Sequence, residues 1–170
     1  MKLLKRLQHL LTGVMLFVIA LSILTWLGVI NPFAAFEKSQ AGTIKTKLSI
    51  KATQGDADAQ NKLGTLLYTT AKREKGDFSK ATQWFKLAAE QKHPIATMNL
   101  GFAYKAGNGV EKDEEKAIQQ FYKAGLLFLE AGFPMDAKDS VHDISTISAQ
   151  HPRKTDLINA IKLYEMSPKK

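Results

Sequence analysis

The chain has 170 residues, which is enough for one small domain with an appendage. It contains no cysteine, so a disulfide framework, a thiol nucleophile and cysteine-ligated zinc are excluded. The formal charge is +8, and Lys2, Lys5 and Arg6 supply three of these charges, which leaves +5 for the rest of the chain. This excess is scattered along the sequence, so we expect no nucleic-acid partner.

An uncharged, strongly apolar segment runs from Leu10 to Ile30. As a helix these residues span roughly 31 Å, because an α-helix rises 1.5 Å per residue, and this length matches the hydrocarbon core of a bilayer. The segment predicts a single transmembrane signal-anchor helix over residues 10–30, preceded by a basic cytoplasmic N-terminus over residues 1–9.

The flanking charges predict the orientation of this helix. Lysine and arginine are retained on the cytoplasmic side, and three of them precede the segment, whereas Lys38 is the only base in the equivalent stretch after it. We therefore expect the N-terminus inside a bacterial inner membrane and the rest of the chain in the periplasm. A cleaved signal peptide, giving a periplasmic or secreted protein, is the alternative, although Pro32-Phe33-Ala34-Ala35 is a poor cleavage site.

Residues 31–42 are rich in Pro, Ser, Ala and Gly without periodicity, which predicts a linker. Thr43 can cap a helix that carries Ile44, Leu48 and Ala52 on one face and ends at Gly55.

Helical periodicity continues from there to the end of the chain, and no segment shows the alternation of a strand. Each further helix has a recognisable first residue or cap, and these are Asp77, Pro94, Asp113, Pro134 and either Thr155 or Asp156. The sequence therefore predicts an all-α domain over residues 43–166 and a short tail over residues 167–170.

Part of this domain is an internal repeat. Ala59, Leu63 and Gly64 recur as Ala96, Leu100 and Gly101 at an offset of 37 residues. A second block is repeated in the same way at an offset of 36, where Lys80, Ala81 and Phe85 match Lys116, Ala117 and Phe121. Glycine lets two helices cross closely, and alanine keeps neighbouring hairpins near enough to stack.

These residues resemble the Sel-one-like repeat, a relative of the tetratricopeptide repeat. The second unit, residues 93–125, matches its pattern at Ala96, Leu100, Gly101, Tyr104, Gly107, Gly109, Val110, Asp113, Lys116, Ala117 and Ala124. The first unit, residues 55–92, matches at Gly55, Ala57, Ala59, Gln60, Leu63, Gly64, Asp77, Lys80, Ala81, Trp84, Phe85, Ala88 and Ala89. The resemblance implies a short α-solenoid of about two clear repeats followed by a divergent helical C-terminus.

No catalytic, metal-binding or cofactor-binding pattern is present, so we expect a protein that is not an enzyme and carries no cofactor. His93, His142 and His151 are not spaced as metal ligands, and they are expected to be solvated or to cap helices. Gly107-Asn108-Gly109 lacks the remaining residues of a nucleotide-binding loop and predicts a turn.

The resemblance implies that the first helix of each hairpin lines a concave groove that binds a protein partner, as a peptide or a helix. The positions on that face are Asn61, Thr65, Tyr68, Met98, Phe102 and Lys105. Exposure of Phe102 and Met98 would indicate a docking surface, and their burial against the next hairpin is the alternative. A second hypothesis is a self-assembling homo-oligomer in a cell-envelope machine, because two repeats leave helical faces uncovered.

Overall fold

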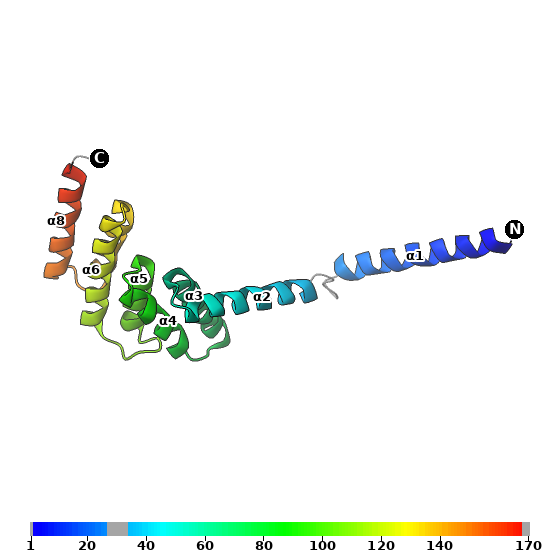
Figure 1. Cartoon of the computed structure of the whole chain (residues 1–170), viewed down its shortest axis with the longest axis horizontal. Helices are drawn as coiled ribbons and strands as arrows, with labels where there is room; N and C mark the ends of the chain where they lie inside the picture. The colour runs from blue at the N-terminus through cyan, green and yellow to red at the C-terminus, as the bar shows by residue number, and fades with distance from the viewer. Residues whose placement is uncertain (1, 27–33, 168–170) are drawn as a thin grey trace. The chain divides into compact units, whose positions relative to one another are not determined.

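The computed structural model describes residues 2–26 and 34–167, and in these ranges the regular secondary structure is α-helical, with short turns between the helices (Figure 1). It divides into two units, Met1–Ile44 and Lys45–Lys170. The helices are α1 Lys2–Trp26, α2 Ala34–Thr53, α3 Ala57–Glu74, α4 Ser79–Glu90, α5 Pro94–Ala106, α6 Glu114–Glu130, α7 Pro134–Ser145 and α8 Pro152–Met166.

Helix α1 occupies most of the segment in which a membrane span is expected, Leu10–Ile30. Its exposed large apolar side chains include Val14–Ile19, Ile23, Leu24 and Trp26. Residues 27–30, at the end of the expected span, lie outside the described residues. Within the residues that are described, no helix combines the length and the apolar character that crossing a membrane requires. The transmembrane helix is therefore not confirmed and stays a prediction.

The linker expected over residues 31–42 is wrong from Ala34 onward, because helix α2 begins there and not at Thr43. The reason is local: after Pro32 this stretch is rich in alanine, glutamate, lysine and glutamine, which favour a helix even without an apolar stripe. The predicted end of the helix is confirmed, since α2 stops at Thr53 and Gly55 follows with a φ of +95°.

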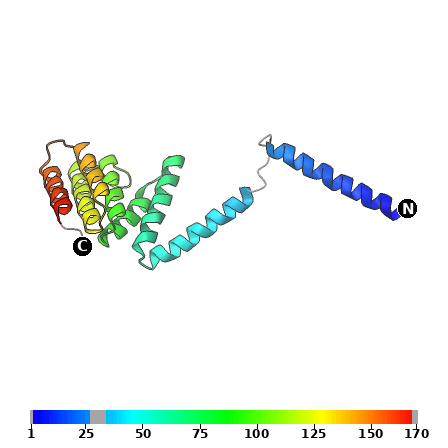
Figure 2. The ribbon, with the colours of Figure 1, turned by 90° about the horizontal axis from the view of Figure 1, so that it is seen from above.

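From Ala57 to Met166 the helices pair as hairpins α3–α4, α5–α6 and α7–α8, which lie side by side (Figure 2). Helix α4 packs against α5 of the next hairpin, and α6 packs against both α7 and α8. Small clusters of buried alanine, leucine and phenylalanine fill the contacts, with Phe121 fully buried in the largest of them. The predicted all-α solenoid is confirmed.

Three predicted helix starts are confirmed. Helices α5 and α7 begin at Pro94 and Pro134, whose fixed φ and missing N–H suit the first helical position. Helix α6 begins after Asp113, whose Oδ1 accepts a hydrogen bond from the Lys116 amide at 2.9 Å.

Two predicted starts are wrong. The N-cap of α4 is Phe78 and not Asp77, because the Asp77 carboxylate accepts bonds from both the amide and the hydroxyl of Ser79, at 2.8 and 2.6 Å. Helix α8 begins at Pro152 with His151 as its cap, ahead of the expected Thr155 or Asp156.

The glycines of the repeat lie where two helices of one hairpin cross. A Cβ on Gly64 would come within 2.7 Å of Phe85 Cε1, and a Cβ on Gly101 would come equally close to Phe121 Cε1. Each phenylalanine ring therefore occupies the space that a side chain would need, which explains why these residue types recur together.

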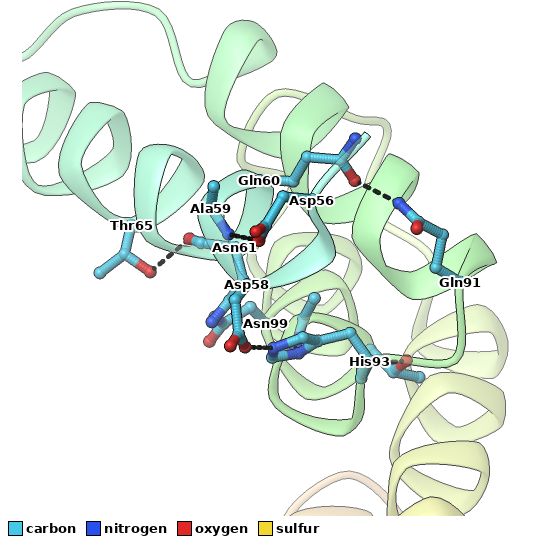
Figure 3. A network of polar contacts seen from close by, with 11 residues as sticks. Asp56, Asp58, Ala59, Gln60, Asn61, Thr65, Gln91, His93 and Asn99 are labelled. Atoms are coloured by element: carbon cyan, nitrogen blue, oxygen red, sulfur yellow. Dashed lines mark hydrogen bonds and ion pairs between the residues drawn. The ribbon is translucent and has the colours of Figure 1, made fainter. Parts of the chain in front are cut away.

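Histidine side chains join the hairpins at two corresponding places. His93 Nδ1 accepts a hydrogen bond from the Ala96 amide at 3.1 Å and so caps α5, which leaves the proton on Nε2. That nitrogen donates to Asp58 Oδ1 on α3 at 2.9 Å (Figure 3). His151 repeats the arrangement at α8, where its Nε2 lies 3.2 Å from Glu115 Oε2 on α6.

We predict that Gly101→Ala destabilises the repeat domain by about 1–3 kcal/mol, because the fully buried Phe121 has no space in which to move away from a new methyl group. Gly76→Ala is the matched control, since the nearest atom to its Cβ is 3.8 Å away. Urea unfolding followed by circular dichroism measures both. Equal stabilities of the two variants would show that the crossing is not a steric constraint.

Removing the charge of Asp58 should make stability depend less on pH. The hydrogen bond from His93 holds the pKa of the Asp58 carboxyl below its ordinary value of 3.8. Its contribution is therefore complete above that pH and is lost as the pH falls through the lowered pKa. Because Asp58 is exposed, we expect Asp58→Asn to cost about 0.5 kcal/mol or less at pH 7 and nothing in strong acid.

Thermal unfolding of both proteins across this pH range checks the prediction. A difference between them that stays constant from neutral to acid pH would contradict it.

Candidate functional site

The most prominent feature of the groove side is a pocket of about 170 Å³ between α3, α4 and α5. It is lined by Thr65, Tyr68, Phe85, Asn99 and Phe102. Its volume equals that of about five water molecules, so it can accept a bulky side chain from a partner. The predicted groove residues Thr65, Tyr68 and Phe102 lie together in this pocket.

Phe102 forms one wall of the pocket and is 38% exposed. Its ring meets the ring of Phe121 edge to face, with 4.9 Å between the centroids. Phe121 lies on α6, the second helix of the hairpin to which Phe102 itself belongs. Phe102 is therefore partly exposed, and it is not buried against the next hairpin. One face of the ring supports the fold while the rest of it borders the pocket.

Tyr68, on α3, is held in place by the turn that follows α5. Its hydroxyl accepts a hydrogen bond from Asn108 Nδ2 at 2.8 Å, and its ring packs 4.9 Å from the Phe78 ring. The backbone carbonyl of Asn108 accepts a second bond from the Thr82 hydroxyl on α4 at 2.8 Å. The turn predicted at Gly107-Asn108-Gly109 is therefore also what fixes a pocket residue.

Gly109 allows this turn to lie directly on the preceding hairpin. Its φ is +72°, and a Cβ would come within 2.6 Å of the Phe78 carbonyl group. Only glycine fits such a position, because both the backbone angle and the contact exclude a side chain.

Asn61, which was expected to line the groove, is buried instead, and its side chain holds the pocket residue Asn99. Its Oδ1 accepts a hydrogen bond from Asn99 Nδ2 at 3.0 Å, and Asn99 is the one of the two that lines the pocket (Figure 3). Nearby, Gln60 Oε1 accepts a bond from Gln91 Nε2 at 2.8 Å. These amide contacts tie α3 to the two helices that follow it.

Met98 and Lys105 do not line the pocket. Met98 is half-buried and packs against the core cluster around Phe121. Lys105 Nζ donates to Thr146 Oγ1 at the end of α7, at 2.7 Å. Burial raises the pKa of the neighbouring Asp143 carboxyl, and the positive charge of Lys105 only partly opposes that shift.

The sequence reasoning missed Phe85 and Asn99 as pocket residues. Phe85, which the sequence indicates only as a repeat residue, is 3% exposed, and its ring also forms part of the pocket surface. Asn99 directly follows Met98, which was predicted to line the groove. A polar residue between the apolar Met98 and Leu100 was the sequence feature that could have indicated it.

The described residues show no arrangement suited to metal binding, since no three His, Asp or Glu side chains among them come together. His93 and His151 cap helices, as expected, and His142 is exposed. Every buried polar side-chain atom in the described part of the chain has a hydrogen-bond partner. The site is therefore an apolar pocket with fixed polar edges, which suits binding.

Comparison with known proteins identifies a repeat type in the middle of the chain. A model of the Sel1 repeat matches residues 57–93 and 94–127, close to the two units predicted from the sequence. A Sel1 repeat protein from Oxalobacter formigenes is similar in structure, with 23% identity and a TM-score of 0.46 over 79% of this chain and 60% of that one.

A protective antigen of uropathogenic Escherichia coli with an SLR fold is also similar, with 26% identity and a TM-score of 0.44. The match covers 72% of this chain and 29% of the antigen, so the chain spans less than two thirds of either protein. No curated relative matches the sequence. Residues 57–127 of the chain thus contain two Sel1 repeats.

Proposed function

We propose that the chain is a membrane-anchored adaptor or scaffold that binds a peptide or a helix of a protein partner in the pocket beside Phe102. Sel1 repeats generally mediate protein–protein interaction. The observation that carries the proposal is the exposed part of the Phe102 ring, which borders a pocket of about 170 Å³. A large apolar side chain that remains partly in water favours a partner that removes it from water.

The pocket is preorganised for such a partner. Asn108 holds Tyr68, and Asn61 holds Asn99, so the polar edges are already in place before binding. Because these side chains are already ordered in the free protein, binding does not have to immobilise them, and the entropic cost of association is lower. An apolar side chain entering between Tyr68 and Phe102 would be the anchor of the interface.

We also propose that residues 10–30 anchor the protein in a bacterial inner membrane, with the N-terminus cytoplasmic and the repeats periplasmic. The exposed apolar side chains of α1 at Val14–Ile19, Ile23, Leu24 and Trp26 support this, because lipid would cover them. Cleavage near Ala35, giving a periplasmic or secreted protein, is the competing outcome.

A charge placed in the pocket should abolish partner binding. Thr65 is exposed and lines the pocket, so Thr65→Glu should reduce partner recovery by about tenfold or more, because the bound partner would remove the new charge from water. Chemical crosslinking and affinity capture from membranes measure this. Gln83→Glu is the matched control, since Gln83 is exposed on α4 and does not line the pocket.

Phe102→Ser should reduce binding in the same way while the helical circular dichroism signal stays intact. Equal recovery with Thr65→Glu and with Gln83→Glu would contradict the proposal, and so would unfolding of both pocket variants.

The anchor is tested by extracting membranes with alkaline carbonate and determining the N-terminus of the recovered protein. We expect the chain to stay in the pellet with its original N-terminus, because a membrane-spanning helix resists extraction. A soluble protein that begins near Ala35 would contradict the anchor and leave the pocket proposal unaffected.

A further inference from the structure

The last hairpin has an open apolar groove on the side that α6 does not cover. Its volume is about 260 Å³, and only residues of α7 and α8 line it. These residues are Lys138, Val141, Ile158, Ile161, Lys162 and Glu165. The groove is separate from the pocket beside Phe102, which lies between α3, α4 and α5.

In the earlier hairpins, the next hairpin packs against the outer side of the second helix. The second helix of each is covered by the next hairpin: α4 by α5, and α6 by both α7 and α8. In the first of these contacts Leu100 packs against Phe85 and its neighbours. Helix α8 has the corresponding position in the third hairpin, but in the described chain it packs only against α6 and α7. Its outer side lacks the helices that cover α4 and α6.

Exposed methionines extend the apolar floor of the groove. Met135 lies one turn before Lys138 on α7 and is 68% exposed, and Met166 lies one turn after Lys162 on α8 and is 81% exposed. Since residues three or four apart share a helix face, both side chains continue the lining of the groove. Flexible, polarizable methionine is well suited to an adaptable contact surface.

The charges around the groove have both signs. Lys138 Nζ forms an ion pair with Glu165 Oε1 at 2.7 Å, and Lys162, one turn from this pair, has no ion pair among the described residues. In a dimer with a two-fold axis, the same surface of both copies forms the contact. A surface that carries both acidic and basic groups can then form ion pairs with its own copy. In that arrangement Lys162 of each copy can face Glu165 of the other.

We propose that this groove binds a second copy of the chain, with the two C-terminal hairpins related by a two-fold axis. Ile158 and Met166 of each copy pack into the apolar groove of the other, and the Lys162 and Glu165 side chains pair across the edge. A partner-binding scaffold would thereby become bivalent, with one pocket beside Phe102 in each copy.

The absence of native cysteine allows a direct test, because a single introduced thiol reports only its own contacts. Lys162→Cys in the purified full-length protein, oxidised in detergent micelles, should form a covalent dimer. Lys86→Cys, on the exposed surface of α4, is the matched control and should form little. Adding Ile158→Asp to Lys162→Cys should lower the dimer yield by about tenfold, because an apolar contact is lost from each side.

Met166→Asp provides a second variant that does not risk the fold, since Met166 is 81% exposed, and it should lower the yield in the same direction. Thr65→Glu should leave the yield unchanged, which separates this contact from the proposed pocket. Equal dimer yields from the two cysteine positions would overturn the proposal. So would a yield that neither groove variant changes, or crosslinking of Cys-substituted position 162 in membranes to a different protein in place of a second copy.

Discussion

The structure depends on one steric constraint, the crossing of two helices at a glycine that faces a phenylalanine ring. Gly64 with Phe85 and Gly101 with Phe121 bring the helices of each repeat so close that no side chain fits between them. The second crossing also determines the candidate site. Because Phe102 follows Gly101 directly, its ring is carried to the edge of Phe121 and remains partly exposed beside the pocket. The packing of Gly101 against Phe121 therefore also leaves the Phe102 ring partly exposed beside the pocket.

Polar contacts join one hairpin to the next in addition to the buried apolar clusters between them. Asn108 reaches back from the turn after α5 to hold Tyr68, and His93 reaches back from the start of α5 to Asp58. Hydrogen bonds have strict geometry, so they fix the register of one hairpin on the next in a way that the small alanine contacts alone do not. The pocket beside Phe102 lies at such a junction, which is why its edges are held from two directions.

Much of the fold could be predicted because its signals are local. Helical periodicity, first-turn prolines and the Gly–Phe spacing sufficed for the repeats. The first part of α2, from Ala34 to the predicted start at Thr43, was missed because it lacks an apolar stripe. The site was predicted only in part. Thr65 and Phe102 line the pocket, whereas Met98 and Lys105 make other contacts. The crossing angles of the helices decide which side of a helix lines a pocket, and a sequence pattern does not contain these angles.

Two Sel1 repeats thus form a preorganised apolar pocket, and we propose that it binds a protein partner. The most direct test replaces Thr65 with a photo-crosslinking amino acid in living cells and, separately, does the same at Lys86 on α4. The account predicts a discrete covalent adduct with one protein from position 65 and none from position 86. The same adducts from both positions, or none from position 65, would contradict it.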